Sequence, residues 1–261
     1  MKTPILDYEL IKRDFREIFF SILNRDISFK MFLYDIFVHG TAYVVGGFLR
    51  DVILKKESRD LDIIVDLKHD LLISVIESAG LLYDINRHGG VKINFKNVVV
   101  DLWSIENNWA FRNNLVKINE DKMLESIAKG CFYNYDSLVI NLHTMNMNIR
   151  YFSNFCETNE LDILQKQSSY KILNPTIEAN ILRAFFLRKF YDVRYTVNTK
   201  VYLLNKIAEF KDVNSGPLEV LVTKKNQYPK YDEVLSVKDI KYYLLELIND
   251  NSIDRQFFLK I

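Results

Sequence analysis

Two neighbouring stretches decide the fold: Ala42-Tyr43-Val44-Val45-Gly46-Gly47-Phe48-Leu49-Arg50-Asp51 and Arg59-Asp60-Leu61-Asp62-Ile63-Ile64-Val65. Residues 42–45 and 61–65 are short apolar runs of strand length, and residues 48–55 between them have a helical pattern. The order is therefore strand, glycine turn, helix, loop and second strand. Such a unit places polar groups of the turn and of the second strand near one another.

The glycine pair is unusual because the chain of 261 residues has only eight glycines, and four of them form the doublets Gly46-Gly47 and Gly89-Gly90. A glycine pair between a strand and a helix lets the backbone approach an anion closely. The helix that follows offers unpaired N–H groups and the positive end of its dipole. Gly46-Gly47 therefore predicts a phosphate-binding turn, whereas Gly89-Gly90 is at least as well explained as a hairpin turn.

Three aspartates form the second part of the pattern. Asp60 and Asp62 are two positions apart, so on a strand they point to the same side. Asp101 interrupts the apolar run 98–103, where a lone charge is costly to bury unless it is paired or binds a metal. A hairpin of residues 91–95 and 98–102 would bring Asp101 beside the pair. The alternatives are a solvated strand edge for the pair and a simple strand-end residue for Asp101.

Carboxylates that share one face repel each other unless a cation lies between them, and Mg²⁺ prefers such hard oxygen ligands and also binds phosphate oxygens. Three carboxylates would hold two metal ions, one to activate an attacking hydroxyl and one to stabilise the leaving pyrophosphate. Beside a phosphate-binding turn, this pattern favours phosphoryl or nucleotidyl transfer.

The rest of the chain divides by pattern. Residues 8–37 have helical spacing, and further strand-length runs follow at 91–95, 98–103, 138–142 and 147–152. From about residue 157 the pattern is mostly helical, with helices expected from residue 174 and at 197–210, 216–225 and 236–249. We therefore expect an α+β fold with two domains, 1–155 and 156–261, the second all-helical.

Composition limits the class of protein. With 49% hydrophobic residues the chain can form a sizeable core, and a formal net charge of +1 argues against binding nucleic acid by bulk charge alone. Cys131 and Cys156 are too few and too far apart for a zinc ribbon or a disulfide framework. We see neither a signal peptide nor an apolar run of about 18 residues, so we expect a cytoplasmic protein without a membrane partner.

These motifs resemble those of a known family. Gly46-Gly47-x-x-Arg50-Asp51 with Arg59-Asp60-x-Asp62 is similar to the head of the class II tRNA CCA-adding enzymes and bacterial poly(A) polymerases, within the polymerase β-like nucleotidyltransferase superfamily. His88-Gly89-Gly90-Val91 resembles their His-Gly-Thr-Val turn. The resemblance covers residues 30–155, with a weaker echo at 174–195. It implies a mixed, mostly antiparallel sheet flanked by helices, and a helical domain that closes over the active-site cleft.

The resemblance also implies roles for single residues. The catalytic, metal-binding carboxylates would be Asp60, Asp62 and Asp101. The nucleotide would be held by Gly46, Gly47, Arg50, Arg59 and Arg183, with Arg50 contacting phosphate or bracing the site, paired with Asp51. The expected cofactors are two Mg²⁺ ions, with Mn²⁺ as an alternative.

The chain departs from the family in two places. Aligned on Leu182-Arg183-Ala184, the family's base-reading positions are Thr176, Ile177 and Asn180, which lack its acidic and basic side chains. The family's Arg-Arg-Asp-Phe segment is replaced by residues 128–136. Arg183, Arg188, Lys189 and Arg194 form either a nucleotide- or RNA-facing stripe or a solvated helix face.

The expected activity is transfer of a nucleoside monophosphate from an NTP to an acceptor hydroxyl, with a tRNA-like RNA 3′ end as the acceptor that the resemblance implies. A protein or small-molecule acceptor is the alternative that the near-zero net charge favours. A catalytically silent nucleotide- or RNA-binding module is a third alternative.

Overall fold

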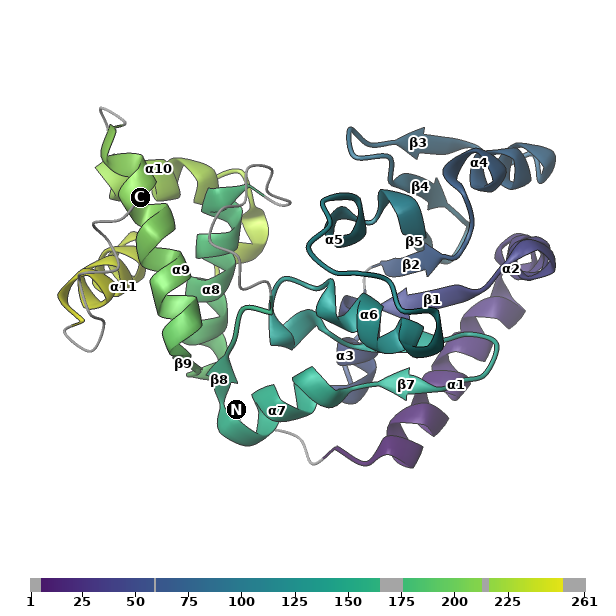
Figure 1. The fold of residues 1–261 in the computed structure, drawn as a ribbon, viewed down its shortest axis with the longest axis horizontal. Helices are drawn as coiled ribbons and strands as arrows, with labels where there is room; N and C mark the ends of the chain where they lie inside the picture. The colour runs from purple at the N-terminus through teal and green to yellow at the C-terminus, as the bar shows by residue number, and fades with distance from the viewer. Residues whose placement is uncertain (1–5, 59, 165–175, 213–215, 251–261) are drawn as a thin grey trace. The chain divides into compact units, whose positions relative to one another are not determined.

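Seven strands form one mixed sheet in the N-terminal part of the chain (Figure 1). The computed structural model describes residues 6–58, 60–164, 176–212 and 216–250. The strand order is β3-β4-β5-β2-β1-β6-β7, in which β2 and β5 are parallel and the other neighbours are antiparallel. The strands are β1 (Ala42–Val45), β2 (Leu61–Val65), β3 (Tyr83–Ile85), β4 (Val91–Asn94), β5 (Val99–Ser104), β6 (Val139–Asn141) and β7 (Met147–Asn148).

The predicted mixed, mostly antiparallel sheet is thus confirmed, with one error. The run 147–152 was expected to be a strand, but β7 ends at Asn148 and the helix α7 (Arg150–Thr158) follows. Phe152 lies on that helix, and its side chain is buried together with that of Phe155. A short apolar run does not by itself distinguish a strand from a buried helical turn.

Helices cover both faces of the sheet. On one face, α1 (Tyr8–Arg25), α2 (Ile27–His39), α3 (Gly47–Ile53) and α4 (His69–Ser78) pack on one another and on the strands. The predicted single helical stretch 8–37 is broken at Asp26, whose buried carboxylate accepts hydrogen bonds from Phe29 N and Asn97 N. On the other face lie α5 (Trp109–Arg112), α6 (Met123–Lys129) and the short 3₁₀ helix η1 (Ile105–Asn107). Two further 3₁₀ helices, η2 (Glu120–Lys122) and η3 (Asn134–Asp136), precede and follow α6 in the chain.

The chain divides into two compact units between Glu157 and Thr158. The C-terminal unit contains α8 (Ile177–Tyr191), α9 (Val197–Ala208), α10 (Gly216–Lys225), α11 (Val237–Asn249), η4 (Glu209–Asp212) and η5 (Pro229–Tyr231). It is helical as expected, except for the pair of two-residue strands β8 (Glu160–Leu161) and β9 (Arg194–Tyr195). Among the described helices, none is both long and apolar enough to cross a membrane.

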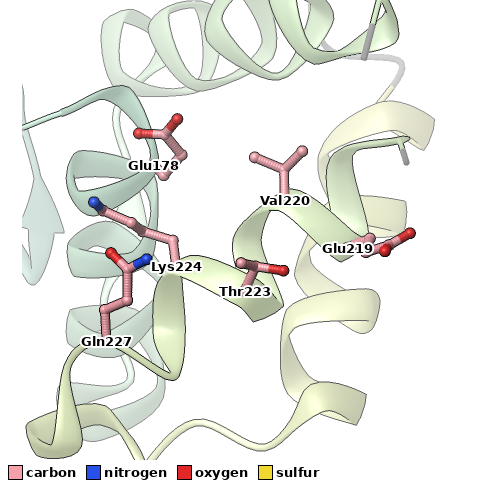
Figure 2. Close-up of a pocket in the computed structure, with 6 residues that line it drawn as sticks. All are labelled: Glu178, Glu219, Val220, Thr223, Lys224 and Gln227. Atoms are coloured by element: carbon pink, nitrogen blue, oxygen red, sulfur yellow. The ribbon is translucent and has the colours of Figure 1, made fainter. Parts of the chain in front are cut away.

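A shallow pocket of about 360 Å³ lies between α8 and α10 in the C-terminal unit (Figure 2). Glu178 lines it from the first turn of α8, and the other lining residues are Glu219, Val220, Thr223, Lys224 and Gln227. At 100° per residue, Glu178 points away from the side of α8 that carries Ile177 and Asn180. The pocket therefore does not contain the aligned base-reading positions.

Candidate active site

Strand register brings two of the predicted carboxylates together. Asp62 on β2 lies beside Asp101 on the parallel neighbour β5, and Val45 at the end of β1 lies opposite Asp62. Directly paired residues of neighbouring strands project from the same face. Both carboxylates are half-buried, and the β4–β5 hairpin that was expected to deliver Asp101 is present. The predicted proximity of these two residues is therefore confirmed at the level of register.

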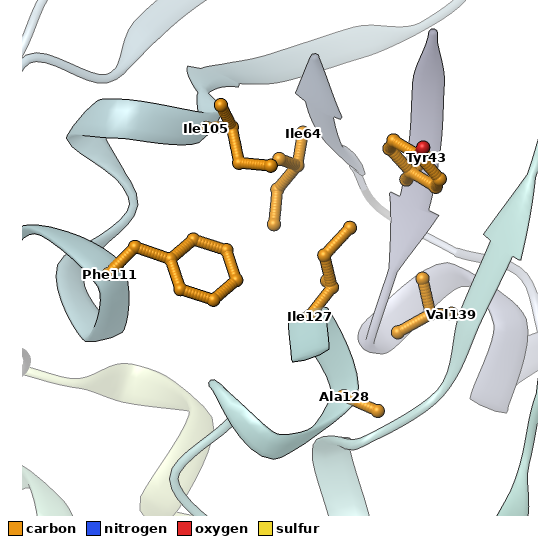
Figure 3. Packing of buried hydrophobic residues seen from close by; sticks show 7 residues of the cluster. All are labelled: Tyr43, Ile64, Ile105, Phe111, Ile127, Ala128 and Val139. Carbon is orange, nitrogen blue, oxygen red and sulfur yellow. The ribbon is translucent and has the colours of Figure 1, made fainter. Parts of the chain in front are cut away.

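The face that carries these aspartates is anchored by an apolar cluster. Ile64, two positions after Asp62, packs with Tyr43 and Val139 from the sheet against Phe111 and Ile127 from the covering helices (Figure 3). Side chains two apart on a strand share a face, so this cluster fixes the direction in which Asp62 projects. Phe111 is thus a core residue.

The carboxylates repel each other. Burial raises the pKa of Asp62 from its ordinary value to about 7, and the negative charges of Asp60, Asp101 and Asp136 act in the same direction. Arg50 opposes the shift. Lys92, opposite Asp101 on β4, has its Nζ 3.5 Å from Asp101 Oδ1 but is half exposed. Among the described residues, the nearby cations therefore do not offset the negative charge around Asp62.

The chemistry of these donors fits a divalent cation, since a hard ion with oxygen ligands would relieve the repulsion that raises the pKa of Asp62. Within the described ranges, no three His, Cys, Asp or Glu side chains converge into a ready ligand set. Register alone thus places Asp62 and Asp101 together, with Asp60 two positions before Asp62. The three-carboxylate metal site stays a prediction.

The glycine turn follows β1 directly, beside Asp62. Gly46 has φ +69° and ψ −113°, a conformation that favours glycine, and its N–H donates to Leu138 O at 2.8 Å. Helix α3 begins at Gly47, and the first N–H groups of a helix have no acceptor within it. Gly46 thus allows the turn, while Gly47 is the first residue of the helix that begins next to the carboxylates.

Arg50 braces the turn rather than projecting away from it. Its Nη1 donates to Asp136 Oδ1 at 3.0 Å, its Nη2 lies 3.8 Å from Asp51 Oδ1, and its guanidinium lies 4.6 Å from the centroid of the Tyr135 ring. The predicted Asp51 pairing is the longer of its two ion pairs. Asp136 is the residue that sequence reasoning missed. The sequence offered one indication of Asp136: it lies in residues 128–136, the segment that replaces a motif of the resembled family.

The second glycine doublet is a hairpin turn. Gly89 has φ +83°, Gly89 N donates to Asn86 O, and Gly90 O accepts from Asn86 N, which closes the turn between β3 and β4. A Cβ on Gly90 would lie 2.5 Å from atoms of both Asn86 and the Trp103 ring. The doublet therefore serves chiefly as the turn that positions β4, and β4 in turn pairs with β5, which carries Asp101.

The other predicted nucleotide-binding residues are placed differently. Arg59 lies outside the described residues, and Arg183 lies on α8 in the C-terminal unit, so both roles stay predictions. The other three cations of the predicted stripe that includes Arg183 form ion pairs: Arg188 with Glu246, Lys189 with Asp239, and Arg194 with Glu160. These pairings favour a helix face over an RNA-facing stripe for Arg188 and Lys189, and Arg194 does not continue that face because it lies on strand β9, after α8 ends at Tyr191.

Comparisons with known proteins agree with this geometry. Residues 42–125 match the family model of the poly A polymerase head domain. No curated protein matches the chain. A tRNA nucleotidyltransferase solved with a primer tRNA and an incoming ATP analog is 18% identical with a TM-score of 0.55, and the match covers 81% of this chain and 60% of that one. The Thermotoga maritima CCA-adding enzyme solved with tRNA is 14% identical with a TM-score of 0.55, and that match covers 92% of this chain and 50% of the other.

The chain shares its fold with these two solved enzymes, and the strand–glycine–helix–strand site lies in its N-terminal unit. Within it, residues 42–125 correspond to the poly A polymerase head domain, so the resemblance expected from the motifs is confirmed. The chain spans between half and three fifths of the length of these two solved relatives.

Proposed function

We propose that this chain is a divalent-metal-dependent nucleotidyltransferase, which transfers a nucleoside monophosphate from an NTP to an acceptor hydroxyl and releases pyrophosphate. One observation carries the proposal: Asp62 and Asp101 are side by side in register, directly next to the Gly46-Gly47 turn. Carboxylates beside an anion-binding turn suit a substrate that brings both phosphate and a metal ion.

In the proposed reaction the acceptor oxygen forms a bond to the α-phosphorus, the bond from the α-phosphorus to the bridging oxygen of the β-phosphate breaks, and the acceptor hydroxyl loses its proton. The backbone of the turn would hold the triphosphate, which fixes the line of attack. Two Mg²⁺ ions, or Mn²⁺, held by Asp60, Asp62 and Asp101 would activate the acceptor hydroxyl and neutralise the leaving pyrophosphate. Arg50 keeps the turn in place through Asp136.

The test uses NTPs labelled at either the α- or the γ-phosphate, with Mg²⁺ and a mixed RNA pool. We expect label from the α-phosphate in the acceptor and label from the γ-phosphate in pyrophosphate. Chelation of the metal should stop the transfer, and added Mn²⁺ should restore it. Transfer of the γ-phosphate instead would show a kinase-type reaction and contradict the proposal.

The acceptor that we propose is an RNA 3′ end, because solved structures of this fold include complexes with tRNA. The C-terminal unit offers a surface with suitable chemistry at residues 224–230, which run from the end of α10 into η5. Tyr228 is half-buried there, with Lys224 Nζ 5.6 Å and Lys230 Nζ 5.8 Å from its ring centroid. An aromatic ring flanked by two cations can contact a base and its phosphates.

We expect the double substitution Lys224→Ala and Lys230→Ala to weaken RNA binding and to reduce the slope of log K against log salt by about 1.4, or 0.7 per lost phosphate contact. Salt titration of binding to a labelled single-stranded RNA measures the slope. The control is Lys238→Ala with Lys241→Ala, which removes equal charge from exposed positions of α11. Equal slopes for the two variants would contradict the proposal that residues 224–230 bind RNA.

A protein or small-molecule acceptor remains the second candidate, because the formal net charge of the chain is only +1. Failure to bind any RNA at low salt, together with transfer to another acceptor, would select it. Metal and NTP binding without transfer to any acceptor would instead select the silent binding module.

A further inference from the structure

Arg50 is engaged from three directions. Asp136 accepts from its Nη1, Asp51 lies near its Nη2, and the Tyr135 ring lies against the guanidinium. Only 15% of the Arg50 side chain and 20% of the Asp136 side chain is exposed, so solvent screens this pair less than a surface pair. The 3.0 Å contact joins residues that are 86 positions apart. Arg50 is thus a fixed cation, and Asp136 is its nearer carboxylate partner.

The turn places Arg50 and Asp136 near Asp62. Val45 pairs with Asp62, Gly46 and the helix that carries Arg50 follow at once, and the carbonyl oxygen of Asp136 lies against Gly46. An arginine in reach of a half-buried carboxylate tends to form a paired, two-pronged contact with it. Such a pair at Asp62 would occupy oxygen atoms that a metal ion needs. Asp136 holds the guanidinium in a different pairing.

The segment that carries Asp136 is itself tied to the glycine turn. Leu138 O accepts from Gly46 N at 2.8 Å, and the carbonyl oxygen of Asp136 lies 3.5 Å from the position of a Cβ on Gly46. The Asp136–Arg50 pair therefore closes a loop of contacts from the turn, through α3, to residues 136–138 and back to the turn.

We propose that Asp136 is a positioning residue, which holds Arg50 away from Asp62 and so keeps the Asp62–Asp101 pair available to a divalent cation. The inference rests on the proposed function, since it assigns Asp136 a part in preparing that same site. It makes no use of Asp136 as a metal ligand. Its distinctive consequence is that the effect of Asp136 on metal binding runs through Arg50.

The experiment measures Mn²⁺ binding to the purified full chain, by electron paramagnetic resonance of the free ion, without any nucleotide. Asp136→Asn should weaken Mn²⁺ binding by about tenfold, as expected for a partner that orients a site without touching the metal. Asp136→Glu keeps the carboxylate and should restore most of the affinity. In the Arg50→Gln background, Asp136→Asn should change the affinity less than about twofold, because the competing guanidinium is gone.

Two results would overturn the inference. The first is an unchanged Mn²⁺ affinity in Asp136→Asn. The second is a tenfold loss of affinity that persists in the Arg50→Gln background, because Asp136 would then act on the metal directly, as a ligand or through its charge. If Asp136→Asn does not fold, the comparison of Arg50→Gln with the double variant decides alone. A wild-type chain that binds no Mn²⁺ would also refute it. A chain that shows the coupling but transfers no nucleotide would refute the proposed function and leave the role of Asp136 standing.

Discussion

Replacing Asp62 with asparagine is expected to lower the rate of nucleotide transfer by about a thousandfold, because loss of a metal-binding carboxylate removes several kcal/mol of transition-state stabilisation. The fold should survive, and the variant should be the more stable protein. Asp62 is ionised at a cost, since burial and the charges of Asp60, Asp101 and Asp136 all raise its pKa, and a neutral amide avoids that cost. Single-turnover kinetics and thermal unfolding in metal-free buffer measure the two effects.

The matched control is Asp66→Asn, the same substitution at an exposed position one residue beyond β2. It should change neither the transfer rate nor the unfolding midpoint, whereas Asp62→Asn should raise the midpoint by about 2–4 °C for each kcal/mol of relieved repulsion. A lower midpoint together with lost activity would mean that Asp62 is a structural residue, and the site assignment would be wrong.

Local sequence patterns predicted the centre of the site because its elements are short and sharply bounded. The strands 42–45 and 61–65 were predicted with the bounds that the structure shows, since a glycine pair and charged residues end their apolar runs. The position of Asp101 followed from the hairpin, because adjacent antiparallel strands leave few registers that keep one face buried. Sequence alone therefore predicted that Asp101 would lie near Asp62, whereas the parallel register of β2 and β5 that pairs the two residues came from the structure.

What the sequence did not show depends on distant partners. The contact between Arg50 and Asp136 has no local signature, because it joins α3 to a 3₁₀ turn 86 residues later. Asp26 was visible as a residue type that caps helices. However, apolar side chains continue around much of α2, so the helical period masked the break. The strand β3 is three residues long, which is too short for a period to be recognised.

The two glycines of the turn should respond differently to alanine. Gly46→Ala should cost about 1–3 kcal/mol of unfolding free energy, because φ +69° with ψ −113° is strained for any side chain. At Gly47 an added Cβ would meet, among the described residues, Arg50 Nη2 at 3.6 Å, which is an ordinary contact. Alanine is also the better helix former, so Gly47→Ala should unfold at the same urea concentration as the wild type or higher.

The functional effects should be separated in the same way. If the backbone at Gly47 approaches the triphosphate, a methyl group there obstructs the approach, and we expect KM for the NTP to rise about tenfold in a protein of undiminished stability. Gly46→Ala should lose activity in proportion to its loss of fold, because its N–H is already donated to Leu138 O. Urea unfolding and steady-state kinetics on both variants give the comparison. An unchanged KM in Gly47→Ala would remove the turn from the triphosphate site and leave it the role of joining β1 to α3.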